Sequence, residues 1–319
     1  MRAQSPAAGP GALRRILVIA NPKSGARQAV PIIKRLVELS AAGLYEMAVR
    51  YTSPDVSAAE LARDADQFDR VVAVGGDGTV TQIMGGMIGA GTPLAITPGG
   101  TGNVLAAALG LSGDWQQACV DALNPECGRR PVDLGVLDEQ FYFALRFSAG
   151  YEAQVTRDTT RELKTRFGKL AYAWYAARHA LRLQVARYQF RVDGGRPFRF
   201  RAESVWVANT GALGVLGLEL NPLIRLDDGQ LDLCIFHVSA LRNLRSVWRW
   251  LLSKERRAGS LDDWLPPAVL RHSVVKDRVS ISASPPQPAQ IDGDTVSTTP
   301  CVIRVVPRAV TVCVPRSPI

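Results

Sequence analysis

The stretch VVAVGGDGT, residues 71–79, determines how the first part of this chain folds. Four apolar residues that suit a buried strand run directly into three glycines, Asp77 and Thr79. Glycine lets the backbone turn sharply and approach a ligand closely. The helix expected after this turn presents its N-terminal N–H groups, which bind phosphate oxygens. The stretch therefore predicts a strand–loop–helix unit that can hold a phosphate group.

Asp77 can be interpreted in two ways. Phosphate alone would repel its carboxylate, so a functional Asp77 would bind a metal ion or accept a proton. Alternatively, the loop is only a tight turn in which Asp77 is solvated. Thr79 can cap the following helix or contact a phosphate in either case. The stretch by itself leaves both interpretations open.

Two further glycine-containing loops follow apolar strands. They are residues 97–103 (TPGGTGN) and residues 21–25 (NPKSG). In an open parallel sheet, ligands bind where the carboxyl ends of the strands meet. We therefore expect all three loops to converge at one edge of the sheet. Neither the P-loop lysine pattern nor GxGxxG is present, which argues against the two commonest nucleotide-binding folds.

Residues 15–110 alternate between strand and helix patterns. This alternation predicts βαβ units and a parallel sheet covered by helices on both faces. The predicted strands are 16–20, 47–52, 71–74 and 94–97, and the predicted helices are 30–42, 58–65, 79–88 and 104–109.

Near residue 129 the pattern changes to short β-rich segments. A hairpin signal, DGG at 193–195, separates two of them, and helical stretches at 163–185 and 243–254 interrupt the series. We predict an α/β domain at 12–137 and a domain of mainly antiparallel strands at 138–304. Because residues 310–314 form a further apolar run, it stays open whether residues 305–319 return to the first domain. The predicted strands are 132–137, 141–147, 188–192, 204–208, 231–238, 274–282 and 302–306.

The composition is that of a globular protein, with 47% hydrophobic and 21% charged residues among 319. A net charge of +9 favours acidic partners, including anionic membrane surfaces. Zinc-finger spacing and interleaved aromatic RNA motifs are missing from the sequence, so we expect no nucleic-acid partner. The five cysteines form no CxxC pair and suit a reducing cytosol. Without a signal peptide or an apolar run of about 20 residues, we expect a cytoplasmic protein that attaches to a membrane peripherally.

Taken together, the motifs resemble the diacylglycerol kinase catalytic family, in its soluble bacterial lipid-kinase branch, which is related to sphingosine and ceramide kinases. They occur in the family's order and cover nearly the whole chain. The motifs are NPKSG at 21–25, GGDGT at 75–79, PGGTGN at 98–103, VDLG at 132–135, DDGQLD at 227–232 and IDGD at 291–294.

The resemblance implies an α/β fold with an N-terminal nucleotide-binding domain that contains a parallel sheet. A C-terminal β-sandwich would bind lipid, with the active site in the cleft between the domains. It also implies transfer of the γ-phosphoryl group of ATP to a lipid hydroxyl, with Mg²⁺, at a membrane surface. Phosphoryl transfer needs positioning and charge neutralisation more than covalent chemistry, so glycine-containing loops and aspartate carboxylates suit it. Whether the protein forms a homodimer stays open.

The resemblance also carries specific roles onto residues of this chain. It implies Asp294 as general base, and Asp77 as a second catalytic residue that belongs to the magnesium cluster. The implied nucleotide contacts are Asn21, Thr52, Gly75, Gly76, Asp77, Gly78, Thr79, Gly100, Thr101 and Asn103. The implied metal ligands are Asp77, Asp133 and Asp228, with the backbone carbonyls of Arg225 and Gln230.

The chain departs from the family pattern in three places. Thr79 is followed by Val-Thr-Gln rather than a segment that ends in Glu, and Gly102-Asn103-Val104 replaces a commoner Asn-Asp-Phe. Asp294 stands where many members have Glu. These differences concern nucleotide contacts and rate rather than reaction class. Without the resemblance, 227–229 and 292–294 would be interpreted as ordinary Asp-Gly turns.

Two segments mix aromatic and basic residues. Residues 163–185 and the segment from Ser246 to Arg257 have the composition of membrane-interface helices. The alternative is that each is an amphipathic helix packed on its own domain.

Two other functions remain as alternatives. One is an NAD kinase-like phosphotransferase, which shares a Gly-Gly-Asp-Gly motif, and the other is an inactive nucleotide- or lipid-binding protein. The set Asp133, Asp228 and Asp294 argues against the first, and the retention of Asp77 and Asp294 argues against the second. The sequence leaves the acceptor open among diacylglycerol, sphingoid bases, ceramide and phosphatidylglycerol.

Overall fold

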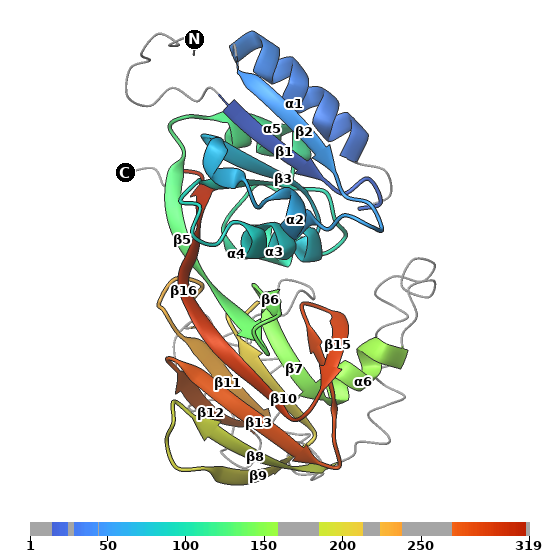
Figure 1. Cartoon of the computed structure of the whole chain (residues 1–319), viewed down its shortest axis with the longest axis vertical. Coiled ribbons are helices and arrows are strands. Elements are labelled where there is room, and N and C mark those ends of the chain that lie inside the picture. The colour runs from blue at the N-terminus through green and yellow to red at the C-terminus, as the bar shows by residue number, and fades with distance from the viewer. Residues whose placement is uncertain are drawn as a thin grey trace, which may run out of the picture. The chain divides into compact units, whose positions relative to one another are not determined.

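The computed structural model describes residues 15–24, 29–43, 45–158, 185–212, 224–237 and 270–316. The chain divides into two compact units (Figure 1). Unit 1 comprises Met1–Val132 and Arg308–Ile319, and unit 2 comprises Asp133–Pro307. The helices predicted at 163–185 and 243–254 lie outside the described residues, apart from residue 185.

Unit 1 is built on a parallel sheet, as predicted. The strand order is β2-β1-β3-β4-β16, and β1 pairs in parallel with both β2 and β3. The end of the long C-terminal strand pairs in parallel with β4, where Val312 lies opposite Leu94. The strands are β1 (Arg15–Ala20), β2 (Glu46–Tyr51), β3 (Arg70–Gly75), β4 (Leu94–Pro98) and β16 (Cys301–Val314).

Helices cover both faces of this sheet (Figure 1). One face packs α1 (Ala29–Gly43) and α5 (Trp115–Leu123), and the other packs α2 (Ala58–Leu61), α3 (Asp77–Gly86) and α4 (Val104–Ala108). Nearly every residue of β1, β3 and β4 is buried. That is the expected burial for strands covered on both sides.

Two helices of unit 1 differ from the prediction. The helix predicted at 58–65 ends at Leu61 and is followed by a 3₁₀ turn, η2 (Ala65–Gln67). A capping box of Ser57 and Glu60 starts it. The sequence interpretation missed α5, which Asp114 starts by accepting a hydrogen bond from the N–H of Gln116.

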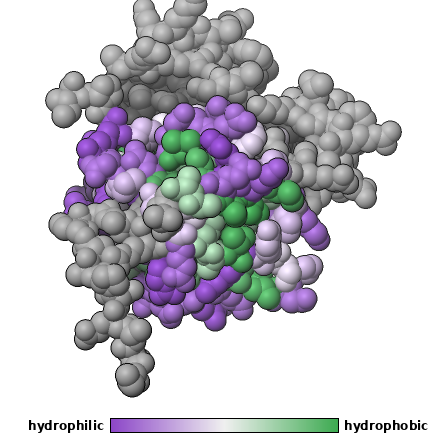
Figure 2. Space-filling model, turned by 90° about the horizontal axis from the view of Figure 1, so that it is seen from above, coloured by the Kyte–Doolittle hydropathy of each residue, from purple (hydrophilic) through white to green (hydrophobic). Residues whose placement is uncertain are grey.

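The outside of unit 1 keeps some large apolar side chains in solvent. Val30 and Val37 of α1 are 70% and 47% exposed, and Val120 of α5 is 43% exposed. In the space-filling view of Figure 2, hydrophobic residues form a band bordered by hydrophilic ones. Exposed apolar residues are common on protein surfaces.

Unit 2 contains antiparallel sheets that enclose a common core, which confirms the predicted β-sandwich. One sheet has the order β12-β11-β10-β7-β14-β15, and the other places β16, β13, β8 and β9 side by side, with β5 and β6 attached. The core is rich in aromatic residues, with Phe143, Phe147 and Phe190 fully buried. The strands are β5 (Gly128–Leu137), β6 (Phe141–Phe143), β7 (Arg146–Gly150), β8 (Ala186–Val192), β9 (Phe198–Ala202), β10 (Ser204–Ala208), β11 (Leu231–Phe236), β12 (Leu270–Val275), β13 (Arg278–Ser284), β14 (Pro288–Ile291) and β15 (Asp294–Thr298), and a helix, α6 (Tyr151–Asp158), follows β7.

Two strands predicted as continuous are each broken by a bend. The segment predicted at 141–147 forms β6 and β7, and the segment predicted at 274–282 spans the end of β12 and most of β13. In both cases an aspartate distant in sequence accepts hydrogen bonds from the N–H groups of the bend. A long-range contact of this kind leaves no trace in the local pattern.

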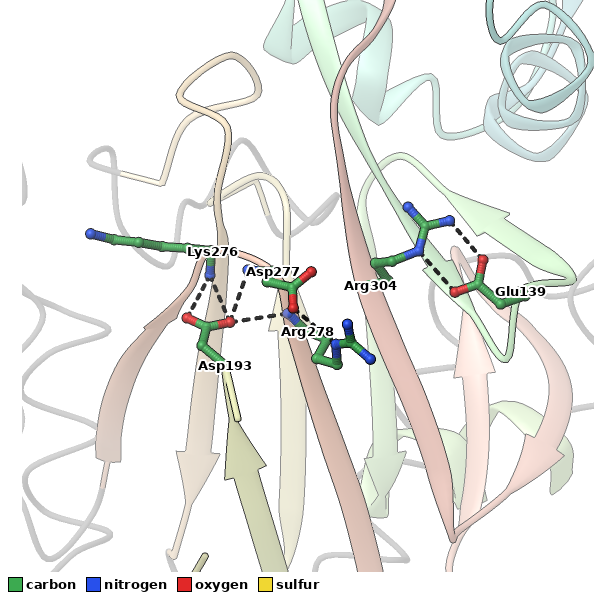
Figure 3. Close-up of polar contacts among 6 residues, drawn as sticks. All are labelled: Glu139, Asp193, Lys276, Asp277, Arg278 and Arg304. Carbon is green, nitrogen blue, oxygen red and sulfur yellow. Dashed lines mark hydrogen bonds and ion pairs between the residues drawn. The ribbon is translucent and has the colours of Figure 1, made fainter. Parts of the chain in front are cut away.

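Asp193 forms the second of these contacts (Figure 3). It occupies the turn between β8 and β9 with a positive φ of 48°. Its carboxylate accepts from the N–H groups of Lys276, Asp277 and Arg278, at distances between 2.8 and 3.2 Å. Burial acts to raise the pKa of Asp193, but these three N–H groups outweigh it, and the pKa is lowered.

Removing this carboxylate should destabilise unit 2 in a pH-dependent way. Because the folded-state pKa lies below the unfolded value of about 3.9, the stabilisation is present above that value. It is lost as the pH falls through the folded-state pKa. We expect Asp193→Ala to lower the free energy of unfolding by about 1–2 kcal/mol at neutral pH.

The measurement is denaturant unfolding at several pH values. The control is Asp277→Ala, whose carboxylate makes only a surface ion pair with Arg278 and should change stability little. An Asp193→Ala deficit that stays constant down to acidic pH would contradict the assignment.

Candidate active site

The three glycine-containing loops of unit 1 contact one another at the carboxyl ends of β1, β3 and β4. The N–H of Asn21, after β1, donates to the carbonyl oxygen of Val74 at 3.1 Å. The N–H of Gly99, after β4, donates to Gly75 O at 2.9 Å. The hydroxyl of Ser24 donates to Gly99 O at 3.3 Å. The structure therefore brings these loops together at one edge of the sheet.

Glycine is required where the loops after β3 and β4 touch. A Cβ on Gly100 would lie 2.5 Å from the Cα of Gly76, closer than any real contact. A Cβ on Gly75 would lie 2.8 Å from the Cβ of Thr79. The backbones can approach this closely only because these side chains are absent.

Asn21 and Thr79 hold the loop after β1 against α3. The Asn21 side-chain amide donates to the Thr79 hydroxyl at 3.2 Å, and its oxygen accepts from the N–H of Lys23 at 3.0 Å. Thr79 is buried, whereas Asn21 is partly exposed. Thr52 follows β2 nearby and donates its N–H to Ala20 O at 3.0 Å. These predicted nucleotide contacts thus share one region of unit 1.

Asp77 connects the first turn of α3 to the start of α4. One carboxylate oxygen accepts from the N–H of Val104 at 3.1 Å, and the other accepts from the N–H of Leu105 at 2.9 Å. A carboxylate at the N-terminus of a helix is favourable because it satisfies N–H groups that have no partner in the helix. Asp77 therefore has a positioning role in the described structure. Its predicted catalytic and metal-binding roles stay predictions.

Asn103 shapes the loop that carries Gly100 and Thr101. It has a positive φ of 49°. Its side-chain oxygen accepts from Gly100 N at 2.9 Å, and its amide donates to Gly100 O at 2.9 Å. Of the other predicted contacts, Gly78 lies in the first turn of α3, and Thr101 is exposed in the same loop as Asn103. A ligand at this edge would meet Thr101 directly, whereas Asn103 acts on the loop.

Unit 2 holds the remaining acidic residues of the predicted site. Asp133 is fully buried, and its carboxylate accepts from Gly229 N at 2.6 Å. Its own N–H donates to Leu226 O at 2.6 Å. Asp133 thereby fixes the turn that presents Asp228. The Asp228 carboxylate accepts from Gln230 N at 3.1 Å.

The pKa of Asp228 is raised. The main cause is loss of hydration around its carboxyl group, and the negative charges of Asp232 and Asp133 add to it. A nearby cation would relieve this unfavourable concentration of charge.

The donor set around this turn suits a hard cation. Carboxylates of Asp133 and Asp228 and carbonyls of Arg225 and Gln230 are oxygen ligands, which Mg²⁺ prefers. The Arg225 side chain is bound to Asp227 at 3.1 Å. However, no three His, Cys, Asp or Glu side chains are grouped for a metal ion within the described ranges. Asp77 belongs to unit 1 and the other predicted ligands to unit 2.

Asp294 begins β15 directly after a tight hairpin turn. Asp292 and Gly293 form this turn with positive φ values of 46° and 94°, and Ile291 pairs with Asp294 across it. The Asp294 side chain is exposed. An exposed carboxylate at a hairpin turn is accessible to a substrate hydroxyl.

Asp292 is a residue that sequence reasoning missed. Its carboxylate accepts from the N–H groups of Ala144, Leu145 and Arg146 at 2.9, 3.0 and 2.9 Å. Its own N–H donates to Arg146 O at 3.0 Å. These four hydrogen bonds fix the turn that carries Asp294 to the start of β7. The available signal was the Asp-Gly turn, since Asp side chains in turns often accept backbone N–H groups.

Comparison with known families now gives the class of protein. Residues 15–137 match the diacylglycerol kinase catalytic domain. Residues 146–314 match the YegS C-terminal NAD kinase beta sandwich-like domain. The chain therefore belongs to the diacylglycerol kinase family and carries the C-terminal domain of its YegS-like members, which confirms the resemblance.

Named relatives agree with this class. A protein of Chromohalobacter salexigens named "Probable lipid kinase YegS-like" is 33% identical over 210 residues, which are 64% of this chain and 66% of that protein. A diacylglycerol kinase of Bacillus subtilis is 28% identical, over 70% of this chain and 74% of its own. For three of the curated relatives, the match spans between 56% and 66% of their own length.

A solved structure shares the fold. A diacylglycerol kinase crystal structure from Bacillus anthracis superposes with a TM-score of 0.71 at 20% identity, covering 95% of this chain and 98% of that one. Within the described residues, no helix is both long enough and apolar enough to span a membrane.

The role of Asp292 can be tested on the amides that it binds. In Asp292→Ala, Ala144, Leu145 and Arg146 lose their acceptor, so their hydrogen exchange should accelerate at least about 10-fold. The matched control in the same turn is Asp294→Ala, which should leave these amides protected. Hydrogen exchange followed by NMR measures both. Equal protection in the two variants would refute the anchoring role.

Proposed function

We propose that this protein is an ATP-dependent lipid kinase that transfers the γ-phosphoryl group to a lipid hydroxyl. The observation that carries the proposal is the contact among three polar, glycine-containing loops at the carboxyl edge of a parallel sheet. Ligands of this fold class bind at such an edge. Membership in the diacylglycerol kinase family supports a kinase.

The nucleotide phosphates would bind in unit 1. Gly76 precedes α3, and the N–H groups in the first turn of this helix have no acceptor within the helix. They suit phosphate oxygens, while the absence of side chains at Gly75, Gly76 and Gly100 permits close approach. Thr101 is exposed in the adjoining loop and would donate a hydroxyl. Asn21, Thr52 and Thr79 would complete the nucleotide contacts.

Mg²⁺ would be held by oxygen ligands. Asp228, Asp133 and the carbonyls of Arg225 and Gln230 would supply them in unit 2, and the carboxylate of Asp77 is a separate candidate ligand in unit 1. When bound, the cation would neutralise charge on the transferring phosphate.

Asp294 would act as the general base. Its exposed carboxylate would take the proton of the acceptor hydroxyl as that oxygen forms a bond to the γ-phosphorus. The bond between the γ-phosphorus and the bridging oxygen breaks at the same time, and ADP leaves. Asp292 would keep the base in place, since it anchors the hairpin turn through four hydrogen bonds.

The acceptor would be a diacylglycerol-like or sphingoid lipid. Support comes from the names of relatives, which include a diacylglycerol kinase. We place the protein in the cytoplasm, at the membrane surface where such a lipid is found.

The test of the base is a labelled phosphate-transfer assay. Protein, γ-labelled ATP, Mg²⁺ and lipids in micelles are incubated and partitioned into organic solvent. We expect Asp294→Ala to lose about 10²–10⁴-fold in kcat, the usual contribution of a general base. Asp294→Glu should retain part of the activity, because it keeps a carboxylate that is displaced by only one methylene. Asp277→Ala is the control that should match the parent protein. Label on NAD rather than on lipid would overturn the proposal that the acceptor is a lipid.

The nucleotide loops can be tested with a substitution that adds one carbon. Gly100→Ala would push the loop away from Gly76, so KM for ATP should rise at least about 10-fold. Gly113→Ala is the matched control, because its new Cβ meets nothing within 4 Å. An unchanged KM in Gly100→Ala would place the nucleotide elsewhere.

A further inference from the structure

The outer face of one sheet of unit 2 carries a row of arginines that the proposed chemistry does not use. Residues of β8 and β9 alternate between the core and solvent, so Tyr188 and Phe190 are buried while Arg187 and Arg191 are exposed. We call this surface the arginine face. It consists of Arg187, Gln189 and Arg191 of β8, Arg199 and Arg201 of β9, and Ser280, Ser282 and Ser284 of β13.

The strand register places these side chains next to one another. Arg187 lies directly opposite Arg201, and Arg199 lies opposite Gln189 and donates to it at 3.0 Å. On the other side of β8, Ser280 lies opposite Arg191. The result is a continuous surface of guanidinium, amide and hydroxyl donors.

Three of these arginines have no ion-pair partner among the residues that the structure describes. Within the described ranges, no carboxylate forms an ion pair with Arg187, Arg191 or Arg201. Two arginines further along the same sheet differ from them, because Arg278 pairs with Asp277 at 2.9 Å and Arg304 with Glu139 at 2.6 Å (Figure 3). The face is therefore positive.

Protection of an edge strand explains only part of this arrangement. Charged residues on an edge strand such as β9 prevent pairing with another chain. However, Arg187 and Arg191 lie on β8, which is already paired on both sides by β13 and β9. Like charges directly opposite each other destabilise a sheet. The Arg187–Arg201 pair is thus unfavourable unless an anion neutralises it.

A groove beside Arg191 offers a place for a second anionic group, apart from the Arg187–Arg201 pair. It has a volume of about 420 Å³ and is lined by Gln189, Arg191, Ser280, Ser282 and Val302, among others. One carboxylate, that of Asp138, also lines it and accepts from the N–H of Val302 at 2.8 Å. Val302 is 41% exposed. Hydroxyl, amide and guanidinium donors beside an exposed apolar residue match a phospholipid headgroup and the base of its chains.

We propose that the arginine face docks the protein on an anionic phospholipid surface. The proposal rests on the proposed function for its rationale, since a lipid kinase must reach a bilayer. A lipid surface fits better than nucleic acid, because the aromatic residues of β8 and β9 face the core. Tyr188 and Phe190 are fully buried, and Phe198 and Phe200 pack against the core. They are therefore unavailable to stack on bases, as single-stranded nucleic acid requires.

The test is co-sedimentation of the full chain with phosphatidylcholine vesicles, with and without phosphatidylglycerol, in the absence of nucleotide. The variant is Arg187→Gln/Arg191→Gln/Arg201→Gln. A basic residue near an anionic surface contributes roughly fivefold to binding, so the three together should contribute about 100-fold. The control Lys34→Gln/Arg63→Gln/Arg129→Gln removes the same charge from exposed positions of unit 1 and should bind like the parent. Replacing the three arginines by lysine should preserve binding.

The outcomes separate this proposal from the kinase assignment. Loss of vesicle binding in the glutamine variant alone, with unchanged turnover of micellar lipid, supports the docking face. Equal loss in variant and control would show a general charge effect and overturn it. Failure of the parent to bind anionic vesicles, or binding to DNA instead, would also overturn it while leaving the kinase activity to be judged by phosphate transfer. Vesicle binding through this face without phosphate transfer would contradict the proposed function only.

Discussion

Backbone N–H groups at bends need hydrogen-bond acceptors, and in this protein aspartate carboxylates supply them across long sequence distances. Asp77 holds the start of α4, and Asp193 holds the bend between β12 and β13. Asp292 holds the bend between β6 and β7, and Asp133 holds the turn that presents Asp228. Each contact gives an acceptor to backbone N–H groups that have no partner within a helix or sheet. The loops of the candidate site depend on three of these four aspartates for their shape.

Local patterns were sufficient for most of the fold. Alternation of strands and helices over 15–110 predicted the parallel sheet, and β-rich segments after it predicted the sandwich. The errors have physical causes that local patterns do not contain. The segments 141–147 and 274–282 were predicted as continuous strands, and in each a distant carboxylate holds the bend. α5 is an exception, because its cap Asp114 and the helical spacing of the buried Ala118, Cys119, Ala122 and Leu123 are local signals that the sequence interpretation did not use.

The candidate site was predicted in part. Three glycine-containing loops after three parallel strands must meet at one edge, and they do. The close contact of Gly76 with Gly100 explains why glycine is needed there. The sequence could not reveal which polar residues hold the backbone in place and which are exposed to a ligand. The side chains of Asp77 and Asn103 accept hydrogen bonds from backbone N–H groups, whereas Thr101 and Asp294 are exposed. That distinction depends on side-chain direction, which residue type alone does not specify.

The C-terminal strand has a consequence for synthesis of the protein. β16 pairs with β13 through residues 301–304 and then with β4 through Val312. The sheet of unit 1 therefore receives its last strand from residues that follow the whole of unit 2 along the chain. Until this strand is in place, β4 presents an open edge, which can pair with another chain. During synthesis, β4 thus stays unpaired on this side until unit 2 has been made, and loss of residues 310–314 should harm the unit that was made first.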